Sequence, residues 1–298
     1  MLDMIGWFLT NVALAFYNFA YAVTHPGLWL DWSNPEAIAR TIYYGASVEL
    51  FFVVFNIALI VTLVGLWRTS VLWACVRGLE GLANTVGRTA AWAGLLMVLV
   101  QVMIVFMQRI FAVSSIGIGF GGVISFDVSW WSEGLKLTNA LVVALCLSYT
   151  FVQRGHVRVD ILYAGFSFRR KRIVDMAGAI FFMAPMAILI WLYGWFFMWR
   201  HLVVPAPSAS DALDRILMRA RVLRWNVETT GFSPQGFSAY FLFKVLLVAM
   251  AGMILLQALA VIWRATAELR EGPQSEDKYL DRDDTGTSES AEHVFETH

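Results

Sequence analysis

The sequence predicts an all-α integral membrane protein, a bundle of about six transmembrane helices plus two interfacial amphipathic helices. Hydrophobic residues make up 59% of the 298 residues and charged residues 15%. A soluble domain typically has roughly 45–50% apolar and about 25% charged residues. Since a soluble core of this length could not bury so much apolar surface, the excess is expected to face lipid.

Six apolar stretches have lengths near the roughly 20 residues with which a helix crosses ~30 Å of hydrocarbon. They divide the chain into an N-terminal part, 1–88, a four-helix membrane domain, 89–268, and a tail, 269–298. The six stretches run over 5–23, 44–66, 89–108, 131–152, 174–199 and 238–263.

Residues 1–88 are expected to form a helical hairpin followed by an interfacial helix on the cytoplasmic side. Asn11 and Asn18 lie seven residues apart, as do Glu49 and Asn56. In an antiparallel hairpin Asn18 would lie near Glu49 and Asn11 near Asn56, and polar groups in membranes bond to neighbouring helices. Glu49 is alternatively an ion or proton site, although its place near the outer end of its span favours a structural role.

Two amphipathic segments are expected to lie in the membrane interface. The first covers 70–88, where apolar residues recur at helical spacing. The second, near 210–225, follows two prolines and lies outside; it is either a membrane-surface helix or a docking surface for an outside partner. The apolar positions are Leu72, Val76, Leu79, Leu82 and Val86 in the first, and Leu213, Ile216, Leu217, Ala220 and Leu223 in the second.

Basic residues predict the orientation of the helices. The loop 153–172 carries six bases and should be cytoplasmic by the positive-inside rule. Alternation then places both termini in the cytoplasm. The C-terminal tail, 269–298, is acidic and rich in Ser, Thr and Gly, a composition typical of disorder.

The sequence shows no recognisable motif for catalysis, cofactor binding or metal binding. We expect no catalytic residues, no cofactor and no metal site, and no nucleic-acid partner. A glycine pattern at Gly117, Gly119 and Gly122 lies in a loop between two spans, outside the strand–helix context of a dinucleotide site. With no internal repeat and few mid-span charges, the chain is expected to be a helper subunit, with lipids and other proteins as partners.

From about residue 89 to 268 the chain resembles the small, DctQ-like membrane subunit of TRAP (tripartite ATP-independent periplasmic) transporters. Trp131, Ser132 and Glu133 match the start of one family span. The string QRGHVRVDILY at 153–163 contains the most specific match, and a basic segment, RRKRIVD at 169–175, follows it. The chain departs from the family in its first 88 residues and in a longer loop over 200–235.

The resemblance implies a non-catalytic small permease subunit of a sodium-coupled transporter in the bacterial inner membrane. Its partners would be a large, DctM-like transporting subunit and a periplasmic, DctP-like binding protein, and its cargo an organic acid such as a keto acid or another carboxylate. An accessory subunit of another redox or ion-translocating complex is the alternative. The assembly candidates are Glu133, Lys136, Arg154, His156, Arg158, Asp160, Glu49 and Asn56, and the docking candidates are Arg215, Arg219, Arg224 and Glu228.

Overall fold

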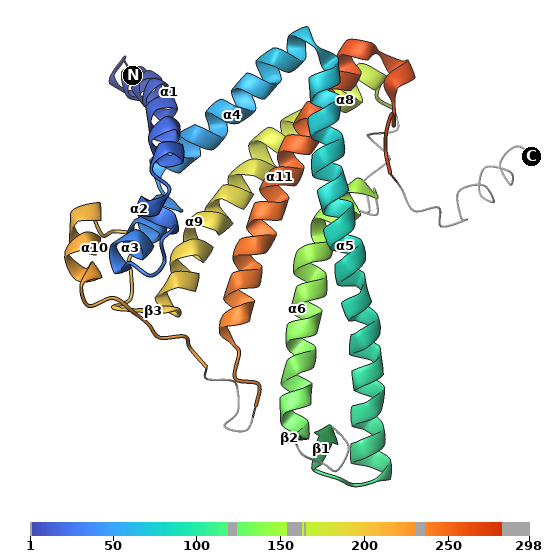
Figure 1. The fold of residues 1–298 in the computed structure, drawn as a ribbon. Helices are drawn as coiled ribbons and strands as arrows, with labels where there is room; N and C mark the ends of the chain where they lie inside the picture. Colours follow the sequence, from blue (N-terminus) through green and yellow to red (C-terminus); the bar gives the residue numbers. More distant parts are fainter. Residues whose placement is uncertain (1, 119–123, 154–162, 164, 230–235, 282–298) are drawn as a thin grey trace, which may run out of the picture.

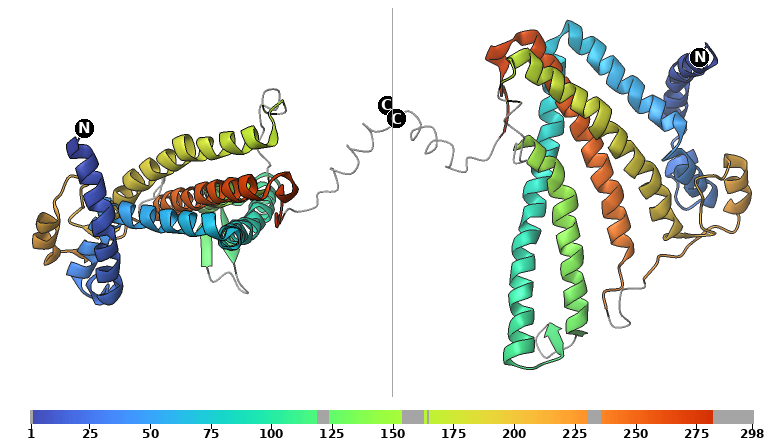
Figure 2. Two further views of the ribbon diagram at one scale, coloured as in Figure 1. Left: turned by 90° about the horizontal axis from the view of Figure 1, so that it is seen from above. Right: turned by 180° about the vertical axis from the view of Figure 1, so that it is seen from behind.

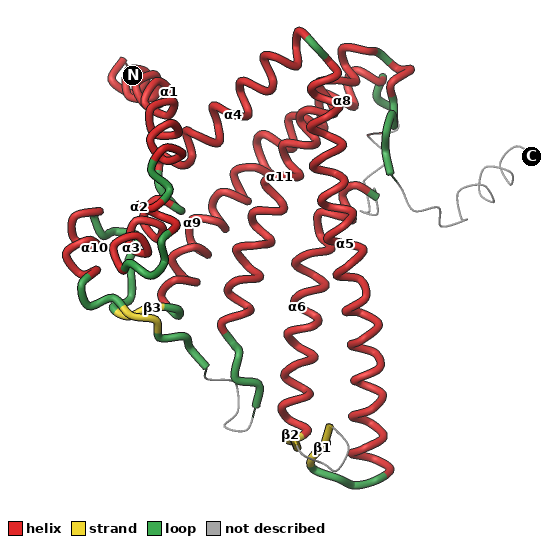
Figure 3. The backbone as a smooth tube through the Cα atoms, viewed as in Figure 1, coloured by secondary structure: helices red, strands yellow, loops and turns green. Residues whose placement is uncertain are grey.

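The computed structural model describes residues 2–118, 124–153, 163, 165–229 and 236–281. Helices dominate, and the only strands in these ranges form two short antiparallel pairs (Figure 3). The helices are α1 (Leu2–Thr24), α2 (Gly27–Leu30), α3 (Pro35–Tyr44), α4 (Val48–Trp67), α5 (Thr69–Val105), α6 (Val128–Val152), α8 (Phe168–Gly178), α9 (Ala184–Arg200), α10 (Leu213–Ala220) and α11 (Phe241–Glu271). The π-helical turns are η1 (Phe106–Ile110) and η2 (Ala179–Met183), η3 (Pro273–Ser275) is a 3-10 turn, and the strands are β1 (Ser115–Ile118), β2 (Ile124–Asp127), β3 (Val203–Val204) and β4 (Arg224–Trp225).

Five helices in the described residues are long and apolar enough to cross a membrane, which confirms a multi-pass, all-α membrane protein. The first apolar stretch forms α1, a helix of 23 residues, but it is not among these five, so its span stays a prediction. The five run over Val48–Trp67, Thr69–Ile110, Val128–Val152, Phe168–Arg200 and Phe241–Glu271.

The long helices diverge like the ribs of a fan from the end of the molecule where α5 begins and α8 lies (Figure 1). The helices α4, α9 and α11 spread to one side, while α5 and α6 run together to the far end, where β1 pairs with β2. The view from behind shows the same spread (Figure 2). The start of α1 and the end of α11 lie toward the same end of the molecule.

The separate interfacial helix expected over 70–88 is wrong. This segment continues without a break into the following span, giving one helix of 42 residues over Thr69–Ile110. At 1.5 Å per residue the helix is about 63 Å long, twice the hydrocarbon thickness. No proline interrupts it, and a glycine inside a helix costs only about 1 kcal/mol. The apolar positions of the segment pack on α11: Leu72, Trp73 and Val76 cluster with Trp263 and Ala267.

Pro185 lies inside one continuous helical span over Phe168–Arg200. A proline removes an N–H donor and crowds the preceding turn of a helix. Here the five residues of η2, Ala179–Met183, adopt the wider π turn just before it, the kind of local adjustment that accommodates such a residue.

The helix α1 packs against α4, but the polar contacts of these two helices differ from the prediction. Asn56 of α4 donates a 2.7 Å hydrogen bond to the Val12 carbonyl of α1. Asn11 instead bonds its own helix at the Trp7 carbonyl, so the expected Asn11–Asn56 pair is not formed. Trp7 packs edge-on against Phe52 of α4.

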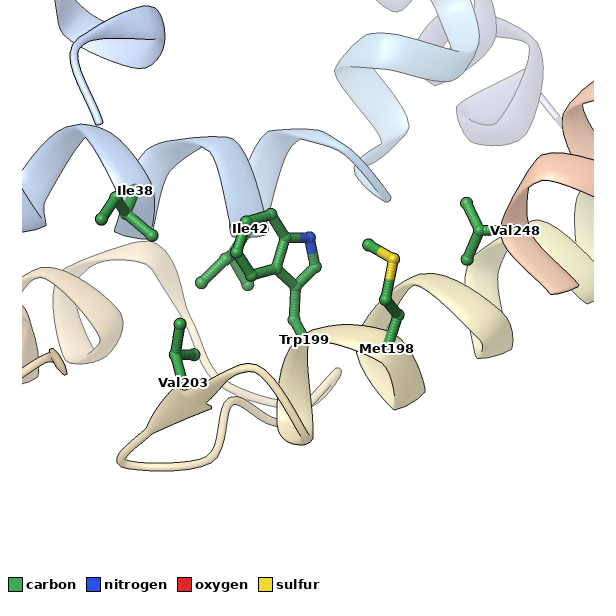
Figure 4. Packing of buried hydrophobic residues seen from close by; sticks show 6 residues of the cluster. All are labelled: Ile38, Ile42, Met198, Trp199, Val203 and Val248. Carbon is green, nitrogen blue, oxygen red and sulfur yellow. The ribbon is translucent and has the colours of Figure 1, made fainter. Parts of the chain in front are cut away.

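The second amphipathic helix is shorter than predicted, and its apolar stripe packs on protein. Ile216 and Ala220 of α10 are buried against Ala39 of α3, with Leu217 at the margin. A neighbouring cluster joins α3 to α9 and α11, where the ring of Trp199 lies over Ile42 (Figure 4). The stripe predicted to meet a membrane surface or a partner is therefore covered by α3.

The tail expected to be disordered over 269–298 is ordered in its first part. The end of α11, the turn η3 and the residues up to Asp281 are described and packed against the bundle. That part of the prediction is wrong because the acidic side chains find basic and amide partners on α5 and α8. Residues 282–298 lie outside the described ranges.

Candidate functional site

A buried network of charged side chains lies where α5, α8 and α11 meet. The guanidinium of Arg264 in α11 makes two hydrogen bonds to the carboxylate of Glu80 in α5, at 2.7 and 2.5 Å. Both side chains are buried. Taking a charge out of water costs several kcal/mol unless the geometry and the hydrogen bonds of its partner are good, and a two-point arginine–carboxylate contact satisfies that condition.

Arg172 of α8 extends the network. Its Nε lies 2.5 Å from an oxygen of Glu268 on α11, whose side chain is 0% exposed. The same guanidinium contacts Asp175 at 3.3 Å and Glu276 of the tail at 2.8 Å. Glu268 also lies 3.5 Å from Arg264. One fully buried carboxylate thus joins the two arginines, and the network ties α5, α8, α11 and the tail together.

The described part of the tail is held against this end of the bundle by two further sets of contacts, one around Trp73 and one around Asp281. The indole of Trp73 donates a 2.8 Å hydrogen bond to Glu271, and its ring meets the ammonium of Lys278 and the ring of Tyr279, both at 5.7 Å. A hydrogen bond from Lys278 to Glu271, at 2.9 Å, raises the pKa of Lys278.

Asp281 makes the second contact. Its carboxylate accepts two 3.0 Å hydrogen bonds from Arg88, and its carbonyl accepts bonds from Asn84 at 2.8 Å and Gln153 at 3.1 Å. The tail therefore reaches α5 and α6 as well as α11.

A second set of polar contacts lies at the opposite end of α11. Lys244, buried near the start of that helix, pairs with Glu228 and lies 5.1 Å from the ring of Phe197. Glu133 of α6 accepts a 2.7 Å hydrogen bond from the backbone N–H of Phe237. These carboxylates hold the segment leading into α11 against the bundle.

The docking candidates on and after α10 fall into two groups. Arg215 and Arg219 are exposed and share Asp211 as an ion-pair partner, both at 3.3 Å. Arg224 is exposed on β4. Glu228 is instead engaged with Lys244 inside the chain. The exposed basic residues here are Arg215, Arg219 and Arg224, together with Arg221 directly after α10.

The predicted assembly residues do not converge on one site. Glu133 is buried in α6 and Asn56 in α4, while Lys136 is exposed one turn after Glu133. Glu49 lies in the first turn of α4, where a carboxylate suits the helix dipole. Burial, followed by this carboxylate, raises the pKa of Tyr43 and of Tyr44. The string residues Arg154, His156, Arg158 and Asp160 lie outside the described residues.

The buried network was not predicted from the sequence, although a signal was present. Glu80 falls on the apolar stripe of its segment beside Val76, and a charge on such a stripe is expected to have a buried partner. Arg264 and Glu268 lie four residues apart at the end of an apolar span, the spacing of neighbours on one helix face. What the sequence could not show was that these two faces meet.

The fold and the network define a multi-pass, α-helical membrane protein with clusters of paired charges at the two ends of α11. Within the described ranges, no group of three or more His, Cys, Asp or Glu side chains could hold a metal ion. Comparison of the chain with protein-family models, with curated proteins and with solved structures finds no match.

Proposed function

We propose that this chain is the small, non-catalytic membrane subunit of a sodium-coupled TRAP transporter for an organic acid. In this role it braces the large transporting subunit in the bacterial inner membrane and helps to dock the periplasmic binding protein. The proposal starts from the residues that resemble the DctQ-like family, above all the string at 153–163 and the Trp–Ser–Glu start of α6.

The main structural support for the proposal is that contacts within the chain bury only a small fraction of each candidate span. In the most apolar window of each span, only 11–28% of the residues are buried. The outward sides of α5, η2 and α9 carry large exposed apolar side chains, among them Leu96, Leu99, Phe181 and Tyr193. Such splayed helices offer broad faces to lipid or to another membrane protein, which suits a bracing subunit.

The outer end adds a second supporting feature. Because the apolar stripe of α10 is used against α3, the helix is fixed in place with Arg215 and Arg219 outward. A fixed, exposed pair of bases is suited to steer an acidic protein surface toward the membrane. In the proposed orientation this face is periplasmic.

The test is co-purification of the tagged full-length chain, expressed together with the genes that flank its own. The proposal expects a large permease of about a dozen helices in the same complex, and sodium-dependent uptake of a carboxylate by vesicles containing the complex and its binding protein. Purification with a haem, flavin or iron–sulfur protein would instead favour the accessory subunit of a redox complex. Recovery of this chain without any partner would also count against the proposal.

A further inference from the structure

A laterally open cleft of about 750 Å³ lies between α6, α8 with η2, and α11. Its walls are apolar and include Phe151, Phe182 and Met186, of which Phe182 and Met186 are strongly exposed. Its polar end is lined by Arg172 and Arg264 of the buried network. The cleft is thus apolar along most of its length and charged at one end.

Gln257 of α11 lines this cleft. Gln257 is only 4% exposed. Its side chain makes no hydrogen bond within the part of the chain that the structure describes. Gln257 lies seven residues before Arg264, hence on the same helix face and about 10 Å deeper along the axis. An unpaired amide at this depth is costly in a membrane, so a bound molecule with hydrogen-bonding atoms would stabilise it.

The charges at the polar end indicate which headgroup would fit. Both arginines are already engaged by carboxylates, and the acids lining the cleft, Glu80, Asp175 and Glu268, outnumber them. Asp175 is the acid with an accessible side chain, and it accepts a hydrogen bond from Tyr163 at 2.8 Å. Lys171 lies 5.4 Å from the Tyr163 ring. An acidic and a basic group therefore both contact Tyr163, which lines the cleft.

We propose that this cleft binds one phospholipid with a zwitterionic, ammonium-bearing headgroup. The ammonium meets Asp175, the phosphate lies toward Lys171, and an ester carbonyl about 10 Å deeper accepts a hydrogen bond from Gln257. The acyl chains then run along Phe182 and Met186. A transmembrane helix fits less well, because its backbone groups are already bonded within the helix and leave nothing to pair with Gln257.

The test is native mass spectrometry of the full-length protein in detergent, titrated with phosphatidylethanolamine and with phosphatidylglycerol of the same acyl chains. The informative variant is Gln257→Met, which keeps length and removes the amide. The matched control is Gln101→Met, the same change at an exposed position of α5. The wild type should retain one phosphatidylethanolamine, and Gln257→Met should bind it about five-fold more weakly, the factor for one hydrogen bond of about 1 kcal/mol.

A thermal measurement separates loss of binding from loss of folding. In lipid-free detergent Gln257→Met should unfold at or above the wild-type midpoint, since it removes an unpaired buried amide. Added phosphatidylethanolamine should then raise the midpoint of the wild type and of Gln101→Met, and raise that of Gln257→Met less. Equal lipid binding by wild type and Gln257→Met, or equal binding of the two lipids, would overturn the proposal. A partner helix that displaces the lipid in a purified complex would overturn it as well.

Discussion

Arg264 and Glu80 form a two-point ion pair between α11 and α5, although 184 residues separate them in the chain. Glu268, one turn after Arg264, lies 2.5 Å from the Nε atom of Arg172 in α8. At this end of the bundle, α5, α8 and α11 are therefore held together by ion pairs between buried side chains. Removing one partner of such a pair leaves the other buried and uncompensated, which is more harmful than removing both.

The first prediction concerns this pair. Glu80→Gln should lower the free energy of unfolding by about 3 kcal/mol, because the guanidinium of Arg264 loses its main counter-charge. Glu36→Gln is the control, since Glu36 pairs with Arg40 at 3.9 Å on the surface, and an exposed pair contributes less than about 1 kcal/mol. Thermal or denaturant unfolding in detergent measures both.

A double variant sharpens this test. Glu80→Leu combined with Arg264→Met replaces both charges by apolar groups and should recover most of the loss. If Glu80→Gln is as stable as Glu36→Gln, the pair does not hold the bundle together.

The second prediction concerns the close approach of α5 and α6. A methyl group added at Gly87 would lie 2.2 Å from the Cβ atom of Tyr149, an atom next to the backbone that cannot rotate away. Gly87→Ala should therefore push the two helices apart and lower the unfolding midpoint, with a cost of about 1–3 kcal/mol.

The control for Gly87→Ala is Gly94→Ala on the same helix, where a methyl group meets nothing within 4 Å. That change should be neutral or stabilise by up to about 1 kcal/mol through helix propensity. Equal effects of the two substitutions would mean that α5 and α6 do not approach closely at Gly87.

The third prediction concerns the tail. Trp73→Leu removes the hydrogen bond to Glu271 and the ring beneath Lys278 and Tyr279. Tryptic cleavage after Lys278 should then become about ten-fold faster, because a loss of 1–2 kcal/mol raises the open population by that order. The rate is followed by mass spectrometry of the products, as the appearance of the new C-terminus at Lys278, which distinguishes this cut from cleavage after Arg282.

Trp92→Leu is the control for the tail, because Trp92 lies on the same helix but is 72% exposed. Its cleavage rate should match the wild type. Equal rates for the two variants would show that Trp73 does not hold the tail.

The fourth prediction rests on the proposed function. Replacing both Arg215 and Arg219 by Gln removes the two exposed bases of α10 without placing new acids beside Asp211. Uptake should fall about ten-fold at low ionic strength and lose much of its salt dependence, since steering by surface charge is screened by salt. The membrane complex should still purify intact.

Arg169→Gln with Arg170→Gln is the matched control, because it removes two exposed bases from α8 at the other end of the fan. Its uptake should stay close to that of the wild type. If the α10 variant transports normally, the basic surface is not a docking site for the binding protein.

Much of the fold follows from the sequence because span length and apolar content depend on local composition alone. The stretches at 131–152 and 174–199 fall within the continuous helical spans Val128–Val152 and Phe168–Arg200, and the stretch at 44–66 overlaps most of Val48–Trp67. The pairing of α1 with α4 was also predictable, since Asn56 on an apolar helix needs a partner nearby. The predicted boundary at residue 88 was wrong. Amphipathic spacing can show that a segment lies in a different environment from the next one, but it cannot show whether the helix is interrupted between them.

The sequence by itself determined the class of protein, the number of long apolar helices to within one, and the positions where polar residues need partners. Only the tertiary structure decided what those partners are. Glu80 meets Arg264, the stripe of α10 meets α3, and the tail meets Trp73 and Arg88. The physical reason is that the cost of burying a charge or exposing an apolar face is local, whereas the contact that relieves it depends on how distant helices pack.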